Sequence, residues 1–135
     1  MLETKFATCL SQAISFSSFL KLAHWNVRGM FFYSYHLLFE NLYEKITGHV
    51  DVLAELASVR GIAINSNVFI EPPQITSSDV KELIITSLEQ MDEYKMLLNE
   101  LLDELDDTIY RSTIIAVEDI LMSLDNVQYL LEASL

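Results

Sequence analysis

Five side chains of this sequence have the types and the spacing of a transition-metal site: His24, His36, Glu40, Asp51 and Glu55. Imidazole and carboxylate ligands together suit Fe(II), Zn(II) and Mn(II). The pairs His36/Glu40 and Asp51/Glu55 each have i,i+4 spacing, which in a helix places two side chains over one spot. At about 100° per residue, the four residues from 36 to 55 fall within about 100° of one another. The pattern therefore predicts a metal site on one face of a single helix.

The distance along this helix argues against a site made by one chain alone. Residues 40 and 51 are about 16 Å apart at about 1.5 Å per residue. Metal–ligand bonds are about 2.0–2.2 Å long, so one ion cannot reach both pairs of the same chain. Two antiparallel copies of the helix, related by a two-fold axis, would bring His36 and Glu40 of one chain beside Asp51 and Glu55 of the other. His24 could complete each of the two identical sites.

An intrachain di-iron centre is not expected. Carboxylate di-iron bundles that hold both metals in one chain use Glu-x-x-His on two helices. The residues three positions before the three histidines are Lys21, Tyr33 and Ile46, so this motif is missing.

The spacing of apolar residues predicts the elements that must position these side chains. The expected helices cover residues 2–26, 34–60, 79–105 and 110–133. Gly29 is expected to end the first helix, Ser34 to cap the second and Gly61 to end it. The only substantial break, 62–75, has room for a short extra turn and is closed by Pro72-Pro73. Four helices with one long connection between the second and third predict an all-α, ferritin-like bundle, a single domain over residues 1–135.

Composition supports this fold and narrows the function. The 135 residues are 51% hydrophobic with only 3 Gly and 2 Pro, which excludes disordered, collagen-like and turn-rich all-β chains. The net charge of -12 argues against nucleic-acid binding, which depends on Lys and Arg. One cysteine, Cys9, cannot form an internal disulfide, and no signal peptide or membrane-spanning run is evident, so a cytoplasmic protein is expected.

Motifs around these residues resemble the Dps mini-ferritins. The hexapeptide His-Trp-Asn-Val-Arg-Gly begins at His24, His36 follows twelve residues later, and Asp-x-x-Ala-Glu runs from Asp51 to Glu55. The resemblance extends over the whole chain but is weaker after Gly61.

This resemblance implies a hollow homo-dodecamer with ferroxidase sites at its two-fold interfaces. Carried over by position, His24, His36 and Glu40 come from one subunit, and Asp51 and Glu55 from its neighbour. Such proteins oxidise Fe(II) with hydrogen peroxide, or more slowly with dioxygen, and store ferric mineral. Trp25 would lie beside the site and intercept oxidising radicals. Zinc or manganese could take the place of iron, because mixed N/O ligands select weakly.

Two departures from the family pattern leave other functions open. No Lys/Arg-rich tail is present, so DNA binding is not expected, although a DNA-protecting protein is one alternative. Tyr110 and Arg111 stand where acids are expected to line an iron uptake pore. A shell-forming protein without ferroxidase activity is therefore a second alternative, and the acid run 103–107 is interpreted as a solvated helix end rather than a pore.

Four further features have structural interpretations. Glu44 shares the stripe of the ligands and is expected to support the site or the fold, and His49 is expected at the surface. Aromatic residues between Phe31 and Tyr35 are expected in an interface and the core. Cys9 lies on an apolar stripe and is expected to be inert core.

Overall fold

The structure, a computed structural model, describes all residues 1–135. It contains four long α-helices, one short 3-10 helix and no strand. These are α1 (Leu2–Asn26), α2 (Phe32–Val59), η1 (Ser66–Val68), α3 (Val80–Glu104) and α4 (Arg111–Ala133). The predicted all-α, ferritin-like bundle with a long connection between α2 and α3 is confirmed. None of the helices is both long and apolar enough to cross a membrane.

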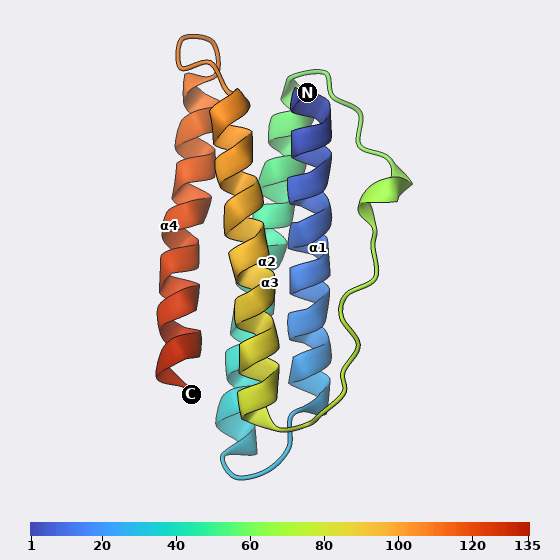
Figure 1. Ribbon diagram of the computed structural model, residues 1–135, viewed down its shortest axis with the longest axis vertical. Helices are drawn as coiled ribbons and strands as arrows, with labels where there is room; N and C mark the ends of the chain where they lie inside the picture. The colour runs from blue at the N-terminus through green and yellow to red at the C-terminus, as the bar shows by residue number, and fades with distance from the viewer.

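The helices run antiparallel in neighbouring pairs around a square (Figure 1). α1 packs against α2 and α3, and α4 packs against α3 and, less extensively, against α2. The connection from residue 60 to residue 79 follows the length of the bundle beside α1 and carries η1. Because of this connection, α2 and α3 run parallel. The turn between α1 and α2 lies at the end of the bundle opposite the N-terminus.

Helix periodicity buries one face of each helix in a common core. A cluster of 27 buried apolar residues takes members from all four helices, among them Phe16, Leu42, Leu98 and Leu124. Each of these side chains is almost wholly removed from water, which stabilises the fold by about 1.5–3 kcal/mol per large apolar side chain. Cys9 belongs to this core as predicted, and burial raises the pKa of its thiol to about 12.

The helix ends differ from the sequence prediction between residues 26 and 34. Gly29 does not cap α1: Val27 follows Asn26 in an extended conformation, and its buried side chain anchors the loop. Gly29 adopts φ +109 further along that loop. Ser34 does not cap α2 either, because α2 begins at Phe32 after Phe31 turns the chain in the left-handed region. Gly61, with φ +74, ends α2 as predicted.

The prediction that His49 lies at the surface is wrong. Its side chain is buried between α2, α3 and α4, where Nε2 lies 3.1 Å from Oγ of Ser123. Its ring centre is 6.0 Å from that of Tyr94, a fully buried side chain of α3. Neither His49 Nδ1 nor the Tyr94 hydroxyl has a hydrogen-bond partner. Burial lowers the pKa of His49 to about 4, with a further contribution from the charge of Lys45.

Candidate metal centre

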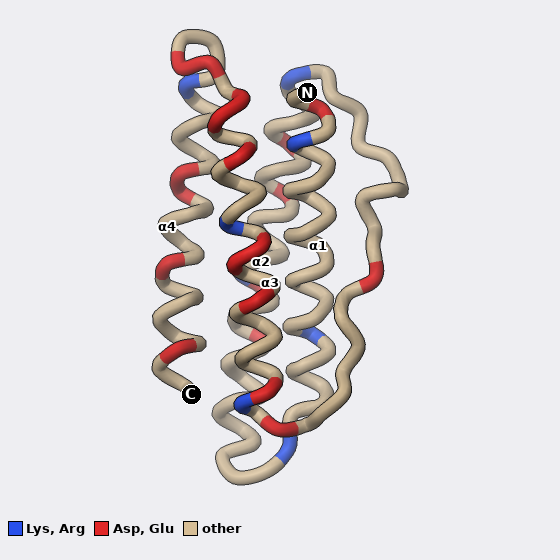
Figure 2. Tube along the Cα trace, viewed as in Figure 1, with Lys and Arg blue, Asp and Glu red and all other residues tan.

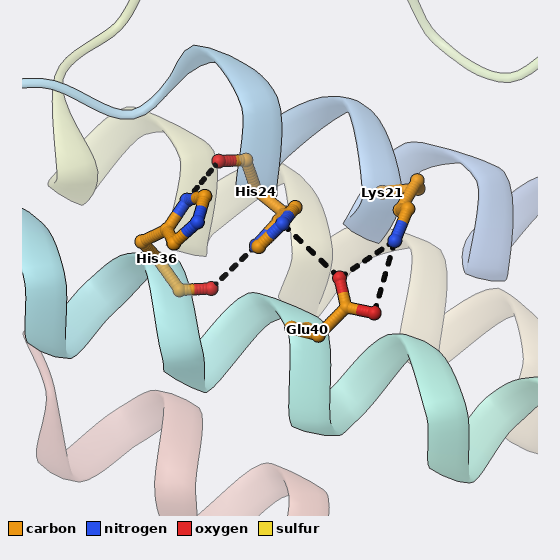
Figure 3. A network of polar contacts seen from close by, with 4 residues as sticks. All are labelled: Lys21, His24, His36 and Glu40. Atoms are coloured by element: carbon orange, nitrogen blue, oxygen red, sulfur yellow. Dashed lines mark hydrogen bonds and ion pairs between the residues drawn. The ribbon is translucent and has the colours of Figure 1, made fainter.

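Three of the five predicted ligands come together where α1 ends and α2 begins. His24 lies in the last turn of α1, and His36 and Glu40 lie in the first turns of α2 (Figure 3). The two imidazole rings are stacked, with centroids 3.6 Å apart and planes 20° from parallel. His24 Nε2 is 3.1 Å from Oε2 of Glu40. The turn between two antiparallel helices thus collects side chains that are twelve to sixteen residues apart in the sequence.

The two histidines fix each other through the backbone. His24 Nδ1 lies 2.6 Å from the carbonyl oxygen of His36, and His36 Nδ1 lies 2.8 Å from the carbonyl oxygen of His24. A carbonyl oxygen only accepts hydrogen bonds, so Nδ1 carries the proton in each ring. In the neutral ring the lone pair is then on Nε2, the atom that would bind a metal, and in His24 this atom faces Oε2 of Glu40. Orientation of a ligating imidazole by a hydrogen bond from its other nitrogen is typical of metal sites.

Lys21 is part of this cluster, and the sequence analysis did not assign it a role. Its Nζ donates to both carboxylate oxygens of Glu40, at 2.9 and 2.7 Å (Figure 3). The ammonium also lies 4.7 Å from the ring centre of Tyr43 and 5.8 Å from that of Trp25. The hydrogen bond from Lys21 is the main reason why the pKa of Glu40 is lowered. Its position three residues before His24, on the same face of α1, was the signal that could have revealed it.

Asp51 and Glu55 do not join the cluster within one chain. Both are exposed on α2, and neither makes a side-chain hydrogen bond or an ion pair. No group of three or more His, Cys, Asp or Glu side chains in the chain is arranged to hold a metal ion. One chain therefore presents two parts of the predicted ligand set, separated along α2.

The surface around the cluster is apolar and exposed. Trp25 is 58% exposed beside His24, and the loop and the start of α2 expose further large apolar side chains. These are Met30, Phe31, Tyr33 and Leu37. The expected core role of this aromatic segment is therefore wrong for Phe31 and Tyr33, which are 68% and 70% exposed. Their expected interface role stays a prediction.

The acidic turn between α3 and α4 is held by contacts within the chain. Asp107 pairs with Arg111 at 2.8 Å, and Asp106 accepts a hydrogen bond from the backbone N–H of Thr108. The guanidinium of Arg60 lies 5.1 Å from the ring centre of Tyr110. The carboxylates of Asp106 and Asp107 are therefore held by local contacts, as in an ordinary helix end.

The four-helix arrangement, with its long crossover and its His/Glu cluster, is that of a ferritin-like protein. The family model described as the ferritin-like domain matches residues 8–135, and the chain belongs to this family.

Similar structures include Dps proteins. The structure of CAIP from Helicobacter cinaedi superposes with a TM-score of 0.86 at 20% identity, covering 99% of each chain. A Dps protein from Bacillus brevis gives a TM-score of 0.85 at 24% identity, covering 98% of this chain and 93% of that one. In sequence, 32 residues are 53% identical to a DNA protection during starvation protein of Brevibacillus brevis. That segment spans 24% of this chain and only 22% of the relative. The predicted resemblance to Dps proteins is thereby confirmed.

Proposed function

We propose that this chain is a mini-ferritin that oxidises Fe(II) at sites shared between two subunits. The ferric product is stored inside a hollow homo-oligomer, which we take to be a dodecamer because the chain resembles Dps proteins. The observation that carries the proposal is the stacked pair His24 and His36, each oriented by a contact from Nδ1 to the other's backbone carbonyl, with Nε2 of His24 3.1 Å from Oε2 of Glu40. Membership in the ferritin-like family and the likeness to Dps structures support it.

A single two-fold axis is able to complete the site. The midpoint of residues 36 and 55 coincides with that of residues 40 and 51, between residues 45 and 46. One antiparallel pairing of α2 with a second copy therefore brings both acids opposite both ligands at once. The exposed, unpaired carboxylates of Asp51 and Glu55 would then face the Lys21, His24 and His36 side of the other copy.

In this proposal iron is the substrate, and the residues of the chain bind and orient it. His24 and His36 supply neutral nitrogen ligands of fixed orientation, and three carboxylates supply oxygen ligands that favour the harder Fe(III) product. Two Fe(II) ions reduce one hydrogen peroxide to two waters, consuming two protons. Trp25, which is exposed beside His24, would donate an electron to a radical that escapes the site.

The charge distribution favours cations over nucleic acid as the partner. Acidic residues are spread along α3 and α4, whereas Lys and Arg are few and scattered (Figure 2). With 8 Lys and Arg residues and a net charge of -12, the chain has few side chains that could displace the counterions of nucleic-acid phosphates. DNA protection by direct binding is therefore not part of the proposal.

The test is removal of the acids that a second subunit would contribute. The double variant Asp51→Asn, Glu55→Gln is loaded with Fe(II) without oxygen and then given hydrogen peroxide, while ferric absorbance is recorded. The product is passed through a sizing column. We expect oxidation at the rate measured in buffer, with the assembled size unchanged.

The matched control is Glu89→Gln, Glu93→Gln, an exposed i,i+4 acid pair on α3 that also removes two charges. It should oxidise iron as the wild type does. Normal oxidation by the Asp51/Glu55 variant would refute the site. An intact wild-type shell that oxidises no faster than buffer would favour a scaffold without ferroxidase activity.

A further inference from the structure

Gly48 lies in the middle of the exposed face of α2, and nothing within the chain requires a glycine there. Its backbone is helical rather than left-handed, because only Gly29 and Gly61 among the glycines have positive φ. A Cβ atom added at Gly48 would meet no atom within 4 Å. Glycine in a helix interior is less favourable than alanine, because it has more backbone entropy to lose. Within a single chain, a larger residue would fit and would strengthen the helix.

Gly48 belongs to a regular stripe on the side of α2 that faces away from the core. The stripe repeats with alternating steps of four and three residues, the spacing of a helix that packs along another helix. Its members are Leu37, Asn41, Glu44, Gly48, Asp51 and Glu55. All six are exposed. Two of them, Asp51 and Glu55, are the acids that the proposed site requires from a neighbouring copy.

The two-fold pairing of the proposed site places Gly48 almost on the symmetry axis. The axis passes α2 between residues 45 and 46, so Gly48 lies about 4 Å from it along the helix, at about 1.5 Å per residue. Glu44 lies about 2 Å from the axis on the other side. In this register Gly48 of each copy stands opposite Tyr43 of the other, and Glu44, the next residue and an exposed member of the same stripe, lies about 1.5 Å further along the helix.

Charge also favours a second copy of this chain as the occupant of the stripe. Near its start, α2 carries His36 and lies beside Lys21 and His24 of α1, and further along it carries the unpaired Asp51 and Glu55. An antiparallel pair matches the nitrogen-rich part of each copy with the acidic part of the other. A parallel pair would instead place like charges together.

We infer that Gly48 lies beside the point of closest approach between α2 and the α2 of a second copy, with the second copy's Glu44 lying across the bare backbone at Gly48. This inference rests on the proposed function, because it uses the same two-fold axis. Packed helices are usually about 8–10 Å apart, and small residues at a crossing point allow a closer approach. Metal–ligand distances tolerate only about 0.2 Å, so the separation of the two helices determines whether Asp51 and Glu55 reach the ion. Gly48 is thus a positioning residue for the site.

The test uses Gly48→Ala and Gly48→Leu in the full chain, with Asn99→Leu as the control at an exposed position of α3. Assembly is followed by sedimentation on dilution, helix content by circular dichroism, and oxidation by ferric absorbance. We expect Gly48→Leu to weaken association through α2 at least 100-fold and to lose oxidation in parallel. Gly48→Ala, which favours the helix, should weaken association about tenfold, and Asn99→Leu should change neither property.

The alanine variant keeps the test decisive if the leucine variant aggregates. A chain that gains helix stability but associates less well shows that the space at position 48 is filled by another copy. Wild-type association and oxidation by Gly48→Ala and Gly48→Leu would overturn the inference. If, in that case, the Asp51/Glu55 variant is inactive, the proposed function stands and only the role of Gly48 fails.

Discussion

The buried histidine of the core makes the stability of the subunit depend on pH in a predictable direction. His49 is 7% exposed, with Nε2 near Ser123 and no charged partner, and burial lowers its pKa to about 4. Its ordinary value, which applies to the unfolded chain, is about 6.5. The folded state therefore disfavours the protonated ring. The stability that His49 contributes is fully present above pH 6.5 and is lost as the pH falls toward 4.

The size of this effect follows from the two pKa values. A pKa difference of about 2.5 corresponds to about 3 kcal/mol between the two protonation states. The linkage relation gives a loss of about 2 kcal/mol by pH 5 and about 3 kcal/mol by pH 4, relative to neutral pH. Losses of this size are a large part of the stability of a small domain, which is about 5–15 kcal/mol.

The perturbation is His49→Gln, which keeps a polar side chain near Ser123 but cannot take up a proton in this range. The free energy of unfolding is measured in denaturant for both proteins at pH 7 and pH 5. Comparing the pH dependence of the two proteins removes the carboxylate titrations that they share. We expect the wild type to lose about 2 kcal/mol more than His49→Gln between these pH values. Equal losses would show that His49 is not held neutral by burial, and the reasoning would be refuted.

Two more changes test particular contacts. Tyr94→Phe removes a buried hydroxyl that has no hydrogen-bond partner. The free energy of unfolding, measured in denaturant, should therefore be unchanged or raised by up to about 1 kcal/mol. A clear decrease would show that the hydroxyl does make a hydrogen bond. Lys21→Gln removes the ammonium that competes with a cation for Glu40, so Co(II), titrated by its visible absorbance, should bind about tenfold more tightly. Lys45→Gln, which alters a lysine bound to Asn126 instead, should leave Co(II) affinity unchanged.

The features that followed correctly from the sequence are those determined by helix geometry. Apolar spacing predicted four helices, and the stop at Gly61 required only a left-handed residue after a long helix. The clustering of His24, His36 and Glu40 followed from two antiparallel helices joined by a short turn. The separation of Asp51 from Glu40 also needed only the rise per residue.

The features that could not be predicted depend on tertiary contacts. Ser34 is a good capping residue, but the anchoring of Val27 and the turn at Phe31 start α2 two residues earlier. His49 has a polar side chain, and its burial depends on the approach of α4, which the periodicity of α2 alone does not fix. The bond from Lys21 to Glu40 links two helices, so the spacing of Lys21 and His24 on α1 could place Lys21 at the site but could not predict its partner.

That bond also determines which cation iron has to replace at Glu40. Glu40 is ionised at neutral pH before a metal arrives, and because Lys21 lowers its pKa it stays ionised further into acid than an ordinary glutamate does. On the proposed loading, Fe(II) displaces an ammonium group from Glu40 and not a proton. Glu40 therefore releases no acid as the site fills, and the heat of loading at neutral pH carries no contribution from a buffer taking up its proton. Protons released when ferric iron hydrolyses therefore report mineral formation, and Glu40 adds none to them when the metal binds.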